Sequence, residues 1–232
     1  MRLISLSIAY SASLSALRLL PCQGLIRDDP LNPLPALQQK QPLRSLPSNS
    51  NATLDAVGLG IGIQNYTCSD TTAVPQSVGA IATLFDITDY LLARDSADWW
   101  KLSQHHFEAY DHVRCQASQN LQRSECEHMA NIWQFHDLGR HWFGSVKGKG
   151  VPFFDLPKHG FLSAQKVGIA SAPNSNAIDW LFLTSDGSHR TKRLFEVYRI
   201  ITTGGRADPS GCKHGDAVLS EKYVAMYWFY SA

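Results

Sequence analysis

The segment Ala56–Cys68, with the sequence AVGLGIGIQNYTC, constrains the fold more than any other part of the chain. Its odd positions from Val57 to Ile63 are apolar, and the even positions between them are glycines. Alternation with a period of two predicts a β-strand whose successive residues lie on opposite faces. One face therefore buries branched side chains, while the glycine face lets another backbone, an aromatic ring or a ligand approach closely. We expect Leu194–Thr203 and Tyr223–Tyr230 to pair with this strand.

Short apolar runs rich in Val, Ile, Phe, Tyr and Trp follow one another from Gly139 onward, separated by turn sequences such as GKG, SDGS and TTGG. This spacing predicts a mainly β fold, an antiparallel β-sandwich or barrel. Tyr223–Tyr230 is apolar on both faces, which predicts a central strand covered on both sides. A further strand is expected at Gly79–Ile87, with a short helix continuing into Tyr90–Ala93 as the alternative.

Helical periodicity interrupts the strands at about 96–136. Trp99, Leu102 and His106 lie at helical spacing, and a second helical pattern covers Glu125–His136. We therefore expect this segment to form a helical insertion or lid in an otherwise strand-rich chain.

Composition limits the partners of this 232-residue chain. Its hydrophobic fraction of 44% is typical of a globular protein, and we expect a single β-rich domain over 56–232. The net charge of +1 argues against nucleic acid and anionic membrane surfaces as partners. No uninterrupted apolar run of the length a membrane span needs follows the N-terminal segment. The oligomeric state is left open.

Several features of the sequence predict secretion to the extracellular space or cell surface. Residues 1–24 are typical of a signal peptide, with a poorly ordered apolar extension as the alternative. Residues 25–55 contain five prolines and predict an arm wrapped on the domain, or a disordered linker. Asn51 and Asn65 begin glycosylation sequons. Asn65 occupies an odd position, as the apolar residues of this strand do, so its side chain points to the same face. A glycan on Asn65 therefore requires that the strand has left the core at this position.

Four cysteines remain after the expected signal peptide, and an even number in a secreted chain predicts disulfides. Three pairings are open. Cys115 and Cys126 lie close enough in sequence to staple the helical insertion. The other two cysteines are Cys68 and Cys212.

The sequence offers no support for a nicotinamide cofactor or a metal. A dinucleotide site needs a glycine-rich turn that opens a helix, whereas Gly58, Gly60 and Gly62 alternate within a predicted strand. Glu125 and His128 have the spacing of a helical metal-binding pair, but no matching second motif is present. We therefore expect neither a cofactor nor a metal site.

His141 is the best candidate for acid–base chemistry. It lies between Arg140 and two aromatic residues, and Asp179 interrupts a later apolar run, so the two could form an acid–base pair with Lys166 as a third ionisable group. The alternative, which we favour, is a structural hydrogen bond from a buried imidazole to a carbonyl group.

Several motifs, in order along the chain, resemble the DUF3455 family of proteins of unknown function. They are GIQNYTC at 62–68, GRHWF at 139–143, PFFDL at 152–156, APNSNAIDWLFL at 172–183, VYRIITTGGRADPSGC at 197–212 and YVAMYWFY at 223–230. The sequence departs from the family pattern at Asp208 and most strongly in the helical region. The resemblance implies a secreted fungal or bacterial β-rich domain and a Cys68–Cys212 bridge, which leaves Cys115–Cys126 as the local pair. Members are often labelled malate dehydrogenase, an activity that these residues do not support.

The matched motifs also supply candidate ligand-binding residues, namely Gln64, Tyr66, Trp180 and Tyr227. The aromatic residues near the C-terminus could line a cavity, although we favour core packing against the glycine face. Our leading hypothesis is a cofactor-independent binding protein for a small apolar or sugar-like ligand, or glycan. The alternatives are a cofactor-independent isomerase, cyclase or dehydratase of fungal metabolism using His141 and Asp179, and a structural wall-associated protein.

Overall fold

The computed structural model describes residues 46–47, 52–93, 96–112, 135–214 and 218–231. Strands dominate these residues, with two α-helices after the second strand. In chain order the elements are β1 (Thr53–Thr67), β2 (Gln76–Asp86), α2 (Thr88–Leu92), α3 (Ser96–His112), β3 (His136–Val146), β4 (Lys149–Leu156), β5 (Gly160–Ala170), β6 (Trp180–Ser185), β7 (Leu194–Gly204), the 3₁₀-helix η2 (Gly211–His214) and β8 (Val218–Ser231).

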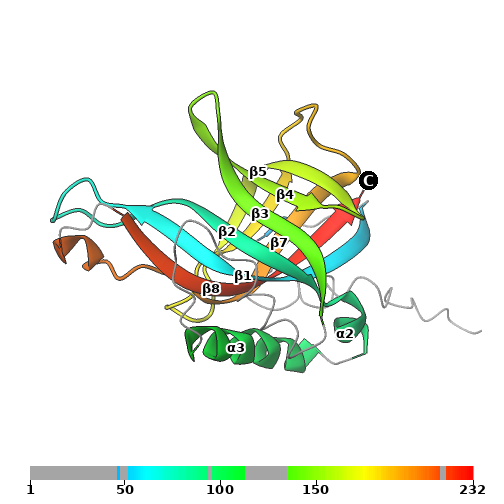
Figure 1. The fold of residues 1–232 in the computed structure, drawn as a ribbon, viewed down its shortest axis with the longest axis horizontal. Coiled ribbons are helices and arrows are strands. Elements are labelled where there is room, and N and C mark those ends of the chain that lie inside the picture. Colours follow the sequence, from blue (N-terminus) through cyan, green and yellow to red (C-terminus); the bar gives the residue numbers. More distant parts are fainter. Residues whose placement is uncertain (1–45, 48–51, 94–95, 113–134, 215–217, 232) are drawn as a thin grey trace, which may run out of the picture.

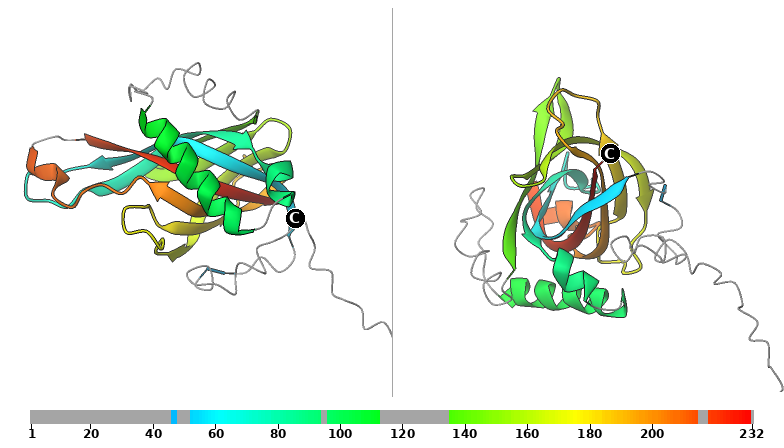
Figure 2. Two further views of the ribbon diagram at one scale, coloured as in Figure 1. Left: turned by 90° about the horizontal axis from the view of Figure 1, so that it is seen from below. Right: turned by 90° about the vertical axis from the view of Figure 1, so that its right-hand side faces the viewer.

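The strands form a closed antiparallel barrel in which each strand pairs with the next and β8 returns to β1 (Figure 1). This confirms the mainly β fold with a helical insertion and selects the barrel over the sandwich. Both α-helices lie on the outside of the barrel, and Figure 2 shows α3 crossing over β8, with β7 beside it.

Strand β1 pairs with β2 on one side and with β8 on the other. The expected pairing with Tyr223–Tyr230 is therefore confirmed. The expected pairing with Leu194–Thr203 is wrong, because β7 lies between β6 and β8. In a barrel of consecutive strands β8 occupies the place beside β1, and its residues 223–230 are buried on both faces as predicted.

The two faces of β1 contact different layers. Val57, Leu59 and Ile61 point outward into a cluster that also contains Trp99 and Leu102 of α3. The aliphatic face thus covers the outside of the barrel and is in turn covered by the helix. The burial of Trp99, Leu102 and His106 confirms the helical stripe expected from the sequence.

The glycine face of β1 points into the barrel, where aromatic rings of β8 fill the space beside it. A Cβ on Gly60 would collide with the ring of Tyr227, and one on Gly58 would lie 3.5 Å from the ring of Phe229. The C-terminal aromatic residues therefore pack against the glycine face, as favoured from the sequence.

Replacing Gly62 should test how tightly β1 and β2 pack. A Cβ there would meet the backbone carbonyl of Ile81 and the Cα of Ala82, and neither atom can rotate away. Gly62→Ala is therefore expected to lower the free energy of unfolding by about 2 kcal/mol in urea denaturation. The control is Gly150→Ala, whose Cβ would lie 3.7 Å from a ring carbon of Phe143. Equal losses of unfolding free energy in Gly62→Ala and Gly150→Ala would contradict the close approach of β1 and β2 at Gly62.

A bulge in β7 anchors α3 to the barrel. The register shifts between Ile200 and Thr203, and Ile201 has a φ of 51°. The extra residue lets both Ile200 and Ile201 face the helix layer. Ser103 of α3 donates a hydrogen bond of 2.9 Å to the Ile201 carbonyl and lies 3.0 Å from the hydroxyl of Thr203.

The helical insertion expected at about 96–136 is present. Helix α3 accounts for the first helical pattern, and β3 begins at His136, where the insertion was expected to end. Strand β2 and the short helix α2 that follows show that both interpretations of residues 79–93 hold in part. Most of the second helical pattern, Cys115 and Cys126 lie outside the described residues.

Only two residues of the proline-rich segment before position 52 are described, and both lie on the barrel. Leu46 is buried in the helix-side cluster, and the Pro47 carbonyl accepts a hydrogen bond of 2.6 Å from the hydroxyl of Tyr198. Strand β1 begins at Thr53, slightly before the domain start expected at 56. The predicted signal peptide and Asn51 lie outside the described residues.

Candidate functional site

A polar cluster lies inside the barrel around Arg199 of β7. Its NH1 donates to Oε1 of Gln64 at 3.5 Å, and its NH2 donates to the Asp179 carbonyl at 2.9 Å. Burial raises the pKa of Tyr227, and this rise is only partly opposed by the positive charge of Arg199 and by hydrogen bonds with Tyr223 and Arg199. The barrel thus brings together Gln64 and Tyr227, two of the candidate ligand residues.

Arg199 carries a buried positive charge, with only 8% of its surface exposed. Among the described residues no carboxylate forms an ion pair with it, and its Nε has no hydrogen-bond partner. Because a guanidinium stays protonated in proteins, neutral oxygen atoms stabilise this charge. Sequence reasoning overlooked Arg199, although a charge inside the apolar run VYRII was a visible signal.

His141 of β3 faces the same interior and is 3% exposed. Its Nδ1 lies 2.9 Å from the Phe153 carbonyl oxygen, and its ring stacks on Phe154 with centroids 4.3 Å apart. Burial lowers the pKa of His141 to about 3; the bond to Phe153 opposes this shift and Arg199 adds to it. His141 is therefore neutral at pH 7, in the bond to a carbonyl group that we favoured from the sequence.

Asp179 has a different partner from His141. Its carboxylate accepts a bond of 2.6 Å from NH2 of Arg206, and no hydrogen bond joins it to His141. Lys166 is exposed on β5. The structure therefore does not assemble the three candidate catalytic residues into one site.

The remaining candidate ligand residues lie at separate places. The Tyr66 hydroxyl donates to the Gly205 carbonyl at 2.6 Å, at the end of the barrel near the disulfide. Trp180 lies in the outer layer and stacks on Trp100 of α3, with ring centroids 5.4 Å apart. Asn65 is partly exposed near the end of β1, where it accepts a hydrogen bond from Ser220, while its neighbours Gln64 and Tyr66 are still buried.

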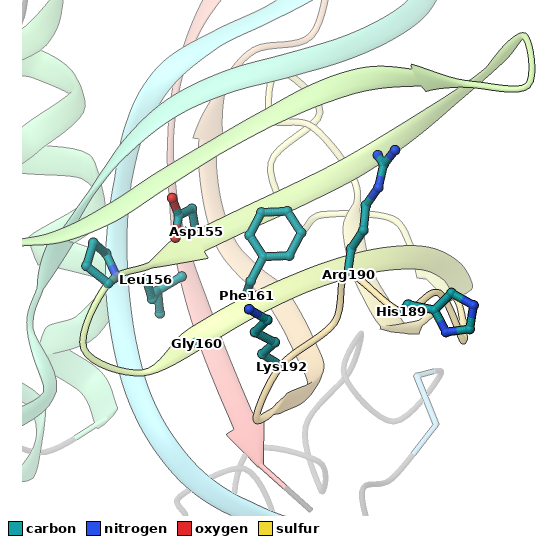
Figure 3. Close-up of a pocket in the computed structure, with 8 residues that line it drawn as sticks. Asp155, Leu156, Gly160, Phe161, His189, Arg190 and Lys192 are labelled. Atoms are coloured by element: carbon teal, nitrogen blue, oxygen red, sulfur yellow. The ribbon is translucent and has the colours of Figure 1, made fainter.

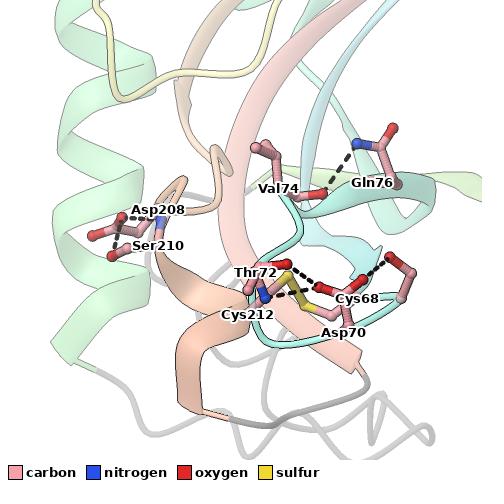
Figure 4. Close-up of a disulfide and its surroundings, with 9 residues drawn as sticks. Cys68, Asp70, Thr72, Val74, Gln76, Asp208, Ser210 and Cys212 are labelled. Atoms are coloured by element: carbon pink, nitrogen blue, oxygen red, sulfur yellow. Dashed lines mark hydrogen bonds between the residues drawn. A yellow bond between two sulfur atoms is a disulfide. The ribbon is translucent and has the colours of Figure 1, made fainter.

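The disulfide Cys68–Cys212 joins the end of β1 to η2, as the family resemblance implied (Figure 4). Both connected loops are ordered in the same way. Asp70 accepts hydrogen bonds from the backbone N–H and hydroxyl of Thr72, and Asp208 accepts the same pair from Ser210. Two preformed turns thus present the cysteines to each other.

An open pocket of about 600 Å³ lies on the outer surface of the barrel, between the β4–β5 turn and the loop that precedes β7. Figure 3 shows the Phe161 ring among the lining side chains, with Asp155 on one side and Arg190 on the other. The lining residues are Asp155, Leu156, Pro157, Gly160, Phe161, His189, Arg190 and Lys192.

The pocket is held together by backbone pairing across its floor. Phe161 and Lys192 exchange two backbone hydrogen bonds of 3.0 and 2.7 Å. Gly160 permits this approach, because its φ is 127° and a Cβ there would collide with the Lys192 carbonyl. Asp155 and Phe161 are cross-strand partners on the outer face. The sequence pattern gave no sign that the two loops meet.

Aromatic side chains pack beside the pocket along the outside of β3, β4 and β5, and Phe153 among them is buried. Phe153 lies 5.7 Å from Trp142 and 5.8 Å from Phe161, measured between ring centroids. The Arg190 guanidinium carbon lies 5.8 Å from the centroid of Phe153. The Phe161 ring with the Arg190 cation beside it in the pocket is suited to a ligand that has both an apolar face and polar groups.

Within the described ranges, no group of three or more His, Cys, Asp or Glu residues is placed to hold a metal ion. None of the helices in that part of the chain has the length and apolar character needed to cross a bilayer.

Comparison with known proteins agrees with the motifs. The family model described as "Protein of unknown function (DUF3455)" matches residues 47–231, which span all eight strands. No curated protein and no solved structure shows significant similarity to the chain. The chain therefore belongs to the DUF3455 family.

Proposed function

We propose that this protein binds a small sugar-like ligand in the outer pocket, without a cofactor. The observation that carries the proposal is the Phe161 ring in a pocket of about 600 Å³ that also contains Asp155, Arg190 and Lys192. An aromatic ring offers a flat apolar contact for one face of a sugar ring, and the charged side chains offer donors and acceptors for its hydroxyl groups. The volume lies in the range of known small-molecule sites.

The barrel interior is a less suitable place for the ligand. Phe154, Tyr227 and Phe229 pack there against one another and against the glycines of β1. The candidate catalytic residues His141 and Asp179 bond to other groups. These contacts support binding at the outer surface over catalysis inside the barrel.

We further propose that the protein acts outside the cell or at its surface. The Cys68–Cys212 bridge supports this location, because structural disulfides persist in oxidising compartments and are rare in the cytosol. The partly exposed Asn65 is available as a glycan acceptor. Mass spectrometry of the culture medium and of the cell lysate from its native cells tests both points: an unmodified, wholly intracellular protein would contradict them.

Phe161→Ala should weaken binding about tenfold, because the variant loses the aromatic contact with the sugar face. Isothermal titration calorimetry with soluble oligosaccharides of cellulose, xylan, chitin and polygalacturonate measures the effect. Phe143→Ala is the control, since Phe143 is 37% exposed and lies outside the pocket. The proposal fails if no oligosaccharide binds to the wild type, or if the two variants bind equally well.

A further inference from the structure

The pocket and its borders carry more positive than negative charge. Among the lining residues Arg190 and Lys192 are cations, and Asp155 is the one carboxylate. Lys158 and Arg193 are also exposed, and they directly follow the lining residues Pro157 and Lys192 in the sequence. The chain as a whole has a net charge of only +1, so the cations are concentrated at this pocket.

The neighbouring carboxylates are already engaged. Asp55 lies 3.3 Å from Nδ1 of His159 and 3.9 Å from NH2 of Arg193. Asp186, at the start of the loop, accepts hydrogen bonds from the Ser163 hydroxyl and the Ser188 backbone. These contacts leave Asp155 as the carboxylate that faces the pocket cations.

Arg190 and Lys192 form no ion pair within the described part of the chain. The guanidinium of Arg190 rests over the Phe153 ring, which lies beside Phe161. A cation–π contact of this kind holds the guanidinium close to the ring and does not use its N–H groups. A guanidinium in this position can bind a carboxylate through two parallel hydrogen bonds.

We propose that the pocket selects an acidic saccharide, a sugar unit that carries a carboxylate. The sugar ring lies against Phe161, and the carboxylate pairs with Arg190 and is attracted by Lys192. This inference rests on the proposed function, since it names the class of sugar for the same pocket. It adds a charge requirement that a neutral sugar site does not have.

The test compares oligogalacturonate with its fully methyl-esterified form, which has the same sugar rings but no charge. The wild type should bind the acid at least tenfold more tightly at low salt, and raising the salt from 20 to 200 mM should weaken only the binding of the acid. Arg190→Gln and Lys192→Gln should each lower affinity for the acid by about tenfold and change affinity for the ester by less than twofold. Isothermal titration calorimetry gives all these values.

Lys149→Gln is the matched control, because Lys149 is an exposed cation at the opposite end of the β3–β4 hairpin from the pocket. It should bind both probes like the wild type. The proposal of an acidic saccharide would be overturned if the wild type bound acid and ester equally well, with Phe161→Ala weakening this binding and Arg190→Gln leaving it unchanged. That result would still support sugar binding in the pocket. Absence of binding to every oligosaccharide tested would overturn both proposals.

Discussion

Removing the Cys68–Cys212 bridge is expected to lower the free energy of unfolding by about 4 to 5 kcal/mol. The two cysteines are separated by 144 positions in the sequence, so the bridge closes most of the described chain into a loop. In the chain-entropy model a loop of this length restricts the unfolded state by about 5 kcal/mol at 25 °C. Residual compactness of the unfolded chain lowers that value. Urea unfolding of Cys68→Ala/Cys212→Ala against the wild type measures the loss.

The single variants provide an internal control for this prediction. Either Cys68→Ala or Cys212→Ala already breaks the bridge, so each single variant should lose nearly as much stability as the double variant. Effects that add up would instead indicate that each cysteine contributes through its own packing. A loss below about 1 kcal/mol in the double variant would show that the bridge does little to stabilise the fold.

The sequence predicted the strands of this barrel better than their arrangement. Alternation in β1 gave both its strand character and the close approach of aromatic rings to its glycines. Closure could not be predicted, because a sandwich and a barrel use the same two-residue alternation and differ only in which edge strands meet. The same limit explains the wrong partner for β7. Its pairing depends on the position of β8, which alternation within β7 does not encode.

The candidate functional residues, like the strands, were predicted only in part. The matched motifs directed attention to Gln64, His141 and Tyr227, and the barrel places all three in its interior. The outer pocket was missed, because Phe161 and Lys192 are distant in sequence and are joined by backbone hydrogen bonds. Backbone pairing between two loops leaves no side-chain pattern to recognise. The Gly160 that permits it resembles any turn glycine in the sequence.

Acid should destabilise this protein through His141. The folded state holds the pKa of His141 at about 3, mainly through burial, whereas an unfolded histidine titrates near 6.5. Between pH 3 and pH 6.5 the unfolded chain therefore binds a proton at His141, whereas the folded protein keeps this side chain neutral. The contribution of His141 to stability is fully present above pH 6.5 and is lost as the pH falls toward 3. At pH 4.5 the loss should be about 3 kcal/mol, and near pH 3 about 4 kcal/mol.

Urea unfolding at pH 7.5 and 4.5, for the wild type and for His141→Gln, measures this contribution. Glutamine cannot be protonated here, so the variant should be less stable at pH 7.5 but should lose about 3 kcal/mol less than the wild type on acidification. Some acid sensitivity should remain, because burial also lowers the pKa of His106 on the buried face of α3. His189→Gln, at an exposed position, is the matched control and should keep the wild-type difference. An equal loss on acidification in His141→Gln and the wild type would mean that the folded barrel admits the proton, and hence water, to His141.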